Sequence, residues 1–241
     1  RTQYVDSLLG VLWSMLKPLA LIGLYALVFS KVITPTVTVD GAPINFGLFL
    51  FAGMLPWTAV QESSQRSCTV FTDQSSLVRH HTVPLSMYPL AIVLSSTLST
   101  LVIVLVFILV KVTVSGSFPA LSLLLLPVIP VQVLFCFGIS LTVSILNVFI
   151  RDISHLTTTV LTVLFFTSPI IFPPGSLPVP VLKLMWLNPL TGYVFLYRDL
   201  LLLDRLPSAP TMISVVLVTA ASIAAGAALY RRSHRRIVDW A

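Results

Sequence analysis

Long stretches without a charged side chain are the most constraining feature of this sequence. Residues 84–110, 112–150 and 206–230 contain no Lys, Arg, Asp or Glu. A helix of about 20 apolar residues crosses the hydrocarbon core of a bilayer, so each stretch is long enough to span a membrane. Charged residues make up only 9% of the 241 residues, whereas a soluble domain carries roughly 25%. This excludes a soluble enzyme, a disordered chain and a nucleic-acid module.

The positions of prolines, glycines and charges divide these stretches into spans. We predict an all-α membrane protein, a single transmembrane domain over residues 1–241 with six membrane-spanning helices per protomer. The expected spans are residues 8–33, 46–66, 84–112, 119–150, 153–172 and 207–230. Pro127 and Pro130 predict a bend in the fourth span.

The few basic residues predict the orientation. Of the 14 Lys and Arg residues, nine fall on one side of the predicted topology: Arg1, Lys17, Arg66, Arg79, Arg151, Arg231, Arg232, Arg235 and Arg236. The other side has Lys31, Lys111, Lys183, Arg198 and Arg205. Cytoplasmic loops are enriched in Lys and Arg, so both termini are predicted to be cytoplasmic. Because the sequence begins at Arg1 without Met, we also expect an upstream cytoplasmic segment.

Two connections contain predicted structure of their own. Residues 72–81, on the predicted cytoplasmic side, are expected to form a short helix that ends in Arg79-His80-His81 before Pro84. Its basic end suits either contact with lipid headgroups or docking into a cytoplasmic partner. Residues 178–205, on the outside, are apolar but interrupted by Asn188-Pro189, which predicts a pair of short re-entrant helices.

No catalytic or metal-binding motif is present in the sequence. The phosphate-binding pattern G-x-x-x-x-G-K-[ST] and the metal pattern H-E-x-x-H are both missing. Cys68 and Cys136 are isolated and are interpreted as small apolar residues, and Glu62 with Arg66 is expected to form a structural i,i+4 ion pair. We therefore assign no catalytic residue, no metal and no cofactor to this chain. Any transport must be passive or driven by another polypeptide.

Five motifs, in order, resemble one family: the transmembrane permease subunits of ATP-binding-cassette polysaccharide exporters, of the O-antigen, teichoic-acid and galactan type. The motifs are SLLGVLW at 7–13 with KPL at 17–19, AGMLPW at 52–57, NVFIRDISH at 147–155, FFTSPI at 165–170 and LNPLT at 187–191. The resemblance covers nearly the whole chain. It implies a homodimer in the bacterial cytoplasmic membrane, paired with two copies of a cytoplasmic ATPase that binds the ATP and Mg. The implied cargo is a lipid-diphosphate-linked glycan.

The resemblance also implies roles for individual residues. Residues 72–81 occupy the place of a coupling helix, which favours docking to the ATPase. The implied coupling residues are Leu77, Val78, Arg79, His80, His81, Arg151, Asp152 and His155. The family often has Lys-Lys or Lys-Arg where this sequence has His80-His81, so the basic character here depends more on pH.

Aromatic residues near the predicted spans are candidates for the wall of a glycan channel, because aromatic faces stack on the CH faces of sugars. These candidates are Tyr25, Phe29, Phe165, Phe166, Trp186 and Tyr193. Packing, lipid contact or a place in the interfacial aromatic belt are the alternative interpretations. Arg151-Asp152 with His155 is interpreted either as a local salt bridge that fixes a short turn or as a latch that responds to the ATPase.

Two other functions are compatible with parts of the pattern. An ATP-driven exporter of a drug or small lipid would use the same scaffold, with a narrower pathway. A membrane enzyme acting on lipid-linked sugars would need a cluster of carboxylates or histidines at one depth, and the eight acidic residues are scattered. Polysaccharide export is the function that the motifs favour.

Overall fold

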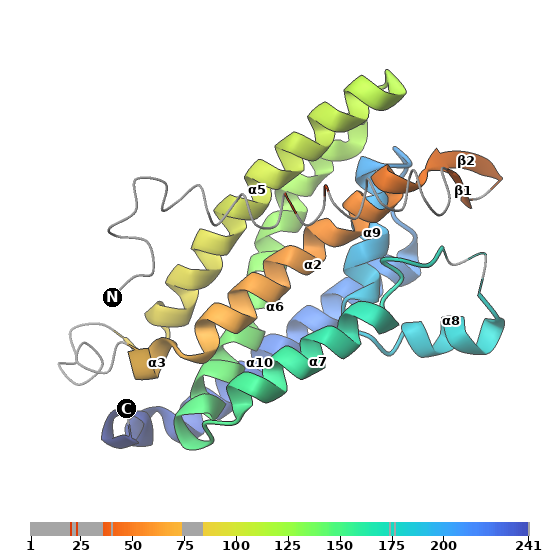
Figure 1. Cartoon of the computed structure of the whole chain (residues 1–241). Helices are drawn as coiled ribbons and strands as arrows, with labels where there is room; N and C mark the ends of the chain where they lie inside the picture. The colour runs from red at the N-terminus through yellow and green to blue at the C-terminus, as the bar shows by residue number, and fades with distance from the viewer. Residues whose placement is uncertain are drawn as a thin grey trace. The chain divides into compact units, whose positions relative to one another are not determined.

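The structure is a computed structural model that describes residues 36–39, 41–73, 84–173 and 177–240, together with residues 20, 23 and 175. Figure 1 shows the order of its elements. They are β1 (Thr36–Val39), β2 (Ala42–Asn45), α2 (Phe46–Cys68), α3 (Val70–Asp73), α5 (Met87–Ser115), η2 (Ala120–Leu124), α6 (Leu125–Phe149), α7 (Ile153–Thr167), α8 (Val179–Met185), α9 (Thr191–Leu201) and α10 (Ala209–Trp240). Most of the predicted first span at 8–33 and most of the predicted coupling helix at 72–81 lie outside the described residues.

The chain forms two compact units. Unit 1 contains residues 1–58, 99–126 and 164–214, and unit 2 contains residues 59–98, 127–163 and 215–241. Within unit 1, the described parts include the hairpin, the first half of α2, the end of α7, and α8 with α9. Unit 2 contains α3 and most of α6.

Three of the six predicted spans are confirmed as helices that are long and apolar enough to cross a membrane: Met87–Ser115, Ala120–Phe149 and Ala209–Ser233. The helix α2 covers the predicted second span, but its end carries Gln61, Glu62 and Arg66, and it does not reach that apolarity. The helix α7 ends at Thr167, five residues before the predicted end of the fifth span. Pro169 accounts for this, because proline cannot donate a backbone hydrogen bond and disfavours helix at the residue before it.

A small β-hairpin departs from the all-α prediction. Thr36–Val39 pairs antiparallel with Ala42–Asn45, with Val39 opposite Ala42, so only two residues form the turn. Gly41 in that turn has φ 83°, which glycine adopts readily. The run Thr-Val-Thr-Val followed by Asp-Gly is a strong local signal for a hairpin, and it was available in the sequence.

Unit 2 has its own apolar core, centred on α3, α6 and the start of α5. Buried Val70, Phe71, Leu85, Leu141, Ile145 and Val148 form one cluster. Cys68 and Cys136 are both buried free thiols, as expected, and Cys68 Sγ lies 3.8 Å from the Thr157 hydroxyl. A Cβ atom built on Gly138 of α6 would lie 2.4 Å from the backbone carbon of Ser222 in α10. These two helices therefore touch backbone to backbone.

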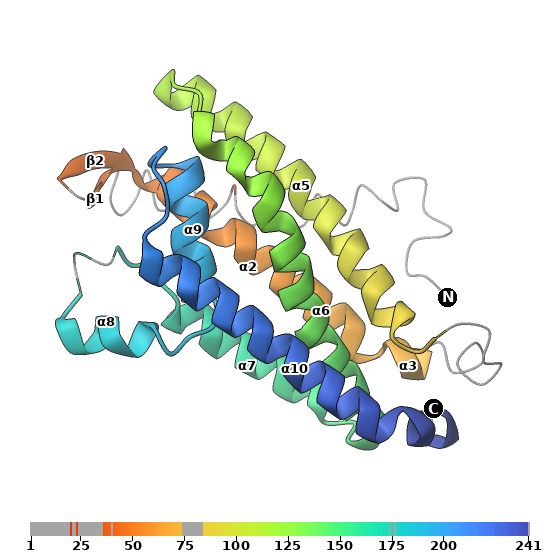
Figure 2. The same cartoon turned by 180° about the vertical axis from the view of Figure 1, so that it is seen from behind.

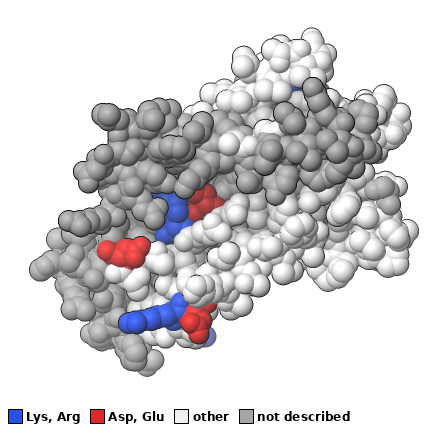
Figure 3. Space-filling model, viewed as in Figure 1, with Lys and Arg blue, Asp and Glu red and all other residues white. Residues whose placement is uncertain are grey.

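Charged side chains are few among the described residues on the face shown in Figure 3. The expected ion pair is confirmed, with Arg66 Nη1 2.8 Å from Glu62 Oε1 on one face of α2. This pair lies within one helix and is partly exposed, so it contributes well under 1 kcal/mol, about what an i,i+4 pair supplies. It is a structural feature of α2.

Candidate functional site

The helix α9 is almost completely buried in unit 1 and is the centre of the candidate site. Every residue from Thr191 to Leu201 except Phe195 is buried. Figures 1 and 2 show α9 alongside the N-terminal part of α2 in both views. A short helix of 11 residues is marginal alone, so tertiary contacts must hold it. Three polar side chains supply these contacts, and all three bond to backbone carbonyls of neighbouring segments.

Arg198 lies at the middle of this arrangement. Its Nε donates to Phe49 O of α2 at 3.3 Å, its Nη2 donates to Ile170 O at 2.7 Å, and its Nη1 donates to Pro169 O. The guanidinium also stacks on the Phe49 ring, 3.5 Å from the centroid. Only 3% of the residue is exposed. Arginine suits this position because its rigid fork presents several donors at once.

Gly53 leaves the space that the guanidinium occupies. A Cβ atom at Gly53 would lie 2.7 Å from Arg198 Nη2 and 3.4 Å from Ile170 Cα. The motif at residues 52–57 therefore contributes a backbone surface against which Arg198 lies. Since the Arg198 acceptors Pro169 and Ile170 belong to the motif at 165–170, two motifs that were recognised separately in the sequence meet at one side chain.

Asn188 brings the motif at 187–191 to the same place. Its Nδ2 donates to Leu164 O at 2.7 Å and to Thr167 Oγ1 at 3.0 Å, while its Oδ1 accepts from Leu190 N at 2.9 Å. The Thr191 hydroxyl donates to Met185 O. The turn between α8 and α9 is thus tied to the end of α7. The Asn-Pro break that the sequence indicated is a buried, fully bonded junction.

Lys111 holds the other end of α9. Its Nζ donates to Leu201 O at 2.8 Å and Leu202 O at 3.1 Å, the carbonyls that the last turn of a helix leaves without partners. Lys111 lies near the C-terminal end of α5, and its side chain is buried. Nearby, Asp204 Oδ1 accepts from Leu121 N at 2.8 Å, which joins the loop after α9 to η2.

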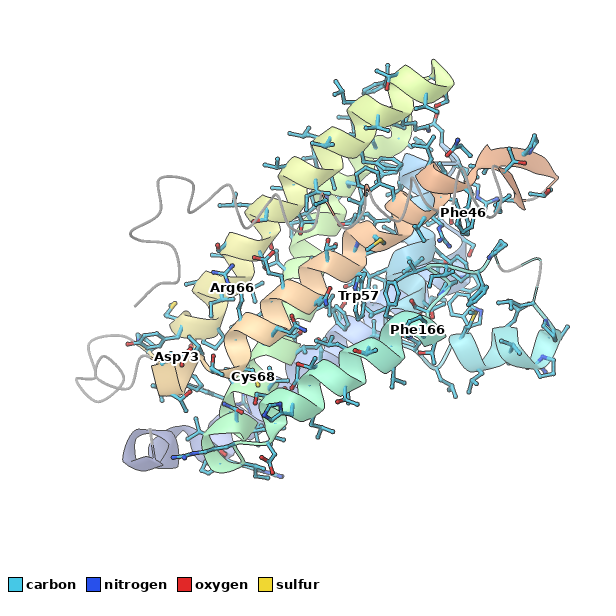
Figure 4. All side chains as sticks on the ribbon, in the orientation of Figure 1. Phe46, Trp57, Arg66, Cys68, Asp73 and Phe166 are labelled. Atoms are coloured by element: carbon cyan, nitrogen blue, oxygen red, sulfur yellow. The ribbon has the colours of Figure 1, made fainter. Side chains whose placement is uncertain are left out.

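The aromatic candidates divide into exposed and buried residues. Trp57 packs on Phe165 with ring centroids 5.3 Å apart, and Phe165 packs on Phe166 at 5.3 Å (Figure 4). Phe166 is 60% exposed and Trp186 is 41% exposed. Tyr193, by contrast, is completely buried in α9. Tyr25 and Phe29 lie outside the described residues.

The coupling candidates that the structure describes lie at the turn between α6 and α7, in unit 2. Arg151, Asp152 and His155 are all exposed. Among the ion pairs between described residues, none joins Arg151 to Asp152, so the turn is held by backbone bonds such as Ile153 N to Ile150 O at 3.1 Å. The remaining candidates, Leu77, Val78, Arg79, His80 and His81, lie outside the described residues.

Sequence reasoning missed the roles of Arg198 and Lys111. Both residues were used only as charges from which the orientation in the membrane was predicted. The available signal was a cation within an apolar segment, which must find hydrogen-bond acceptors when it is buried. The sequence does not show which carbonyls those are, because the acceptors lie 149, 29 and 28 residues from Arg198.

Three long apolar helices and a buried short helix held by backbone acceptors define a multi-pass helical membrane protein. Among the described residues no group of three or more His, Cys, Asp and Glu side chains is placed to hold a metal. The family model for ABC-2 type transporters matches residues 1–202, and the chain belongs to this family.

Proteins similar to this chain are named as components of export or transport systems. The chain is 29% identical over 230 residues to the O-antigen export system permease protein RfbA of Myxococcus xanthus, covering 92% of this chain and 86% of that protein. RfbA of Klebsiella pneumoniae is 29% identical over 205 residues, covering 83% and 75%. The polysialic acid transport protein KpsM of Escherichia coli is 25% identical over 236 residues, covering 96% and 88%.

Removal of the Asn188 side chain tests the junction between α7 and α9. Asn188→Ala removes the hydrogen bonds that Asn188 makes with Leu164 O and Leu190 N, and we expect a loss of about 2 kcal/mol, which lowers the melting temperature by roughly 5 °C. The measurement is thermal unfolding of the purified full chain in detergent. Leu187→Ala, at a residue 79% exposed, is the matched control. Equal melting temperatures for the two variants would contradict the role given to Asn188.

Proposed function

We propose that this chain is the membrane-spanning subunit of an ATP-driven exporter that moves a lipid-diphosphate-linked polysaccharide across the bacterial cytoplasmic membrane. One observation carries the proposal: besides the family match over residues 1–202, proteins named as O-antigen export system permeases align with most of the chain. O-antigen, galactan and teichoic acid are the cargo classes that fit. The long apolar helices and the absence of a phosphate-binding motif in the sequence agree with a permease that lacks its own ATPase site.

The working assembly is a homodimer bound to two copies of a cytoplasmic ATP-binding-cassette ATPase, which binds the ATP and Mg. Six spans per protomer place both termini in the cytoplasm and α8 and α9 on the outside. Unit 1 exposes several large apolar side chains in α8 and in the segments before and after it, which supports burial of these side chains in lipid or against the second copy. They are Phe166, Phe172, Val179, Leu184, Trp186 and Leu187.

The ATPase acts on the permease through contacts with residues 72–81 and with the turn at Arg151, Asp152 and His155. The exposure of these three side chains supports contact with a partner. When the two ATPases close on ATP, the coupling helix moves and opens a path for the glycan. Phe165, Phe166 and Trp186, with Tyr25 and Phe29, line that path. Stacking of aromatic rings on sugar CH faces requires no particular sugar sequence, which suits a chain that must slide.

The coupling residues provide the test. With a candidate cassette ATPase co-expressed, we expect the double variant Arg79→Ala, His80→Ala to lower export about tenfold or more, a change that corresponds to a typical coupling free energy. Surface glycan is measured by blotting, and co-purification of the ATPase is measured in parallel. Lys183→Ala, an exposed cation of α8 on the opposite side of the proposed topology, is the matched control and is expected to export normally. Undiminished export by the double variant would contradict the proposal that these residues couple the chain to the ATPase.

A further inference from the structure

Unit 1 contains a cavity of about 220 Å³ at the end where the hairpin and the start of α2 meet the second half of α9. Its lining includes Thr38, Phe49, Phe195, Arg198, Asp199 and Arg205. The roles described above for α9 use Arg198 and Phe49 but leave the cavity itself without a role. Liquid water takes about 30 Å³ per molecule, so the cavity has room for several waters or for one small ring.

The charged side chains of this cavity already have partners, so they favour hydrogen bonding to a neutral ligand over binding of a charged one. Arg205 Nε donates to Asp199 Oδ1 at 2.6 Å, so the two formal charges compensate each other. The Asp199 side chain is only 7% exposed, whereas that of Arg205 is 50% exposed. The nitrogens of Arg198 are directed at three backbone carbonyls. An anion would therefore have to displace Asp199 from Arg205, which disfavours a phosphate or carboxylate ligand.

Aromatic and apolar groups supply the rest of the lining. Phe195 is the only residue of α9 that is not buried, and it lines the cavity. Its ring is backed by Trp186, with centroids 5.4 Å apart and planes at 39°. Phe49 also lines the cavity, but the Arg198 guanidinium covers one face of its ring and only 1% of the residue is exposed, so Phe195 supplies the accessible ring. The cavity thus combines a fixed aromatic surface with a carboxylate and guanidinium pair and the exposed Thr38 side chain.

A neutral sugar ring has the complementary chemistry. One side of a pyranose ring presents CH groups that pack on an aromatic face, while neighbouring hydroxyls both donate to a carboxylate and accept from a planar guanidinium. We propose that this cavity binds a single neutral hexopyranose unit. The volume sets the limit at one ring, because sites for drug-sized ligands occupy about 300–1,000 Å³.

This inference deepens the proposed function and rests on it for the source of the sugar, which would be a unit of the exported glycan. Because the bound unit would contact Phe195 and Arg205 at one end of unit 1, the site would hold the glycan where it leaves or enters the path. Such holding requires weak binding, so that the chain is released at each step. We expect a dissociation constant in the millimolar range for one ring.

The experiment uses the full chain in lipid nanodiscs with methyl β-D-galactopyranoside and methyl α-D-mannopyranoside as probes and glycerol 1-phosphate as the anionic comparison. Saturation-transfer NMR reports binding. Phe195→Leu keeps an apolar side chain but removes the ring, and Arg205→Gln keeps a hydrogen-bonding side chain but removes the guanidinium. Phe118→Leu, at an exposed phenylalanine that does not line the cavity, is the matched control. Melting temperatures show that each variant is folded.

We expect at least one methyl hexoside to bind the unaltered chain and the control variant equally, and each cavity variant about tenfold more weakly. No hexoside binding, binding unchanged by both cavity variants, or Arg205-dependent binding of glycerol 1-phosphate alone would overturn the inference. The proposal of a sugar site in the cavity and the proposal of an ATP-driven exporter can be rejected independently. ATP-driven glycan export without sugar binding here rejects only the cavity site, whereas hexoside binding without ATP-driven export rejects the exporter.

Discussion

Arg198→Leu is expected to destabilise the protein by about 4 kcal/mol, a large part of the 5–15 kcal/mol that stabilises a typical domain. Leucine fills the space of the side-chain stem but leaves Phe49 O, Pro169 O and Ile170 O without their donor. It also removes the stack on Phe49. The start of α2 and the segment after α7 then lose their common link to α9. We expect a fall in melting temperature of roughly 10 °C or complete loss of folded protein.

Two further variants separate the donor geometry from the charge. Arg198→Lys keeps the charge, but one ammonium group cannot reproduce the guanidinium fork, so only partial recovery is expected. Gly53→Ala keeps the arginine and places a methyl group 2.7 Å from Nη2, so it should produce a milder form of the same defect. The measurements are yield and thermal unfolding by size-exclusion chromatography. A lysine variant as stable as the unaltered chain would show that charge alone suffices at this position.

Gly138→Leu is expected to prevent α6 and α10 from packing. The Cβ atom alone would lie 2.4 Å from Ser222 C and 2.6 Å from Ile223 N, and backbone atoms cannot rotate away as a side chain can. Gly226 on α10 approaches Gly138 O in the same way, at 2.8 Å for its Cβ. Small residues allow such close contact between membrane helices. Overpacking here should cost about 3 kcal/mol or more.

Ala221→Leu is the matched control for this prediction. It adds a similar volume to α10, but at an exposed position one residue from the contact. We expect normal yield and normal melting for the control and little or no folded protein for Gly138→Leu, measured by size-exclusion chromatography in detergent. Wild-type behaviour of Gly138→Leu would mean that these two helices do not pack as described.

The apolar stretches of the sequence predicted the long helices well, because apolarity over about 20 residues has one main structural solution in a bilayer. The break at Asn188-Pro189 was equally visible, since proline and its preceding residue resist helix. The hairpin at Thr36–Asn45 was missed although its signals were local. The early end of α7 also had a local cause, Pro169, and could have been predicted.

The arrangement of the candidate site was harder to predict from the sequence. Its motifs were recognised one by one, but their meeting point was not, because it depends on long-range bonds. Lys111 and Leu201 are 90 residues apart, and Asn188 and Leu164 are 24 apart. The aromatic candidates show the same limit. Phe166 and Tyr193 look alike as aromatic residues of apolar segments, and only the packing distinguishes the exposed ring from the buried one.

The most direct test of the central claim is transport by purified components. The full chain and a cassette ATPase that co-purifies with it are reconstituted in vesicles that contain an undecaprenyl-diphosphate-linked glycan, and glycan that becomes accessible to a glycosidase on the opposite side is measured over time. We predict translocation that requires ATP hydrolysis, this chain and the ATPase together. Translocation at the same rate without ATP or without the ATPase, or ATP hydrolysis by the complex with no glycan translocated, would contradict the claim that this chain is the membrane subunit of an ATP-driven glycan exporter.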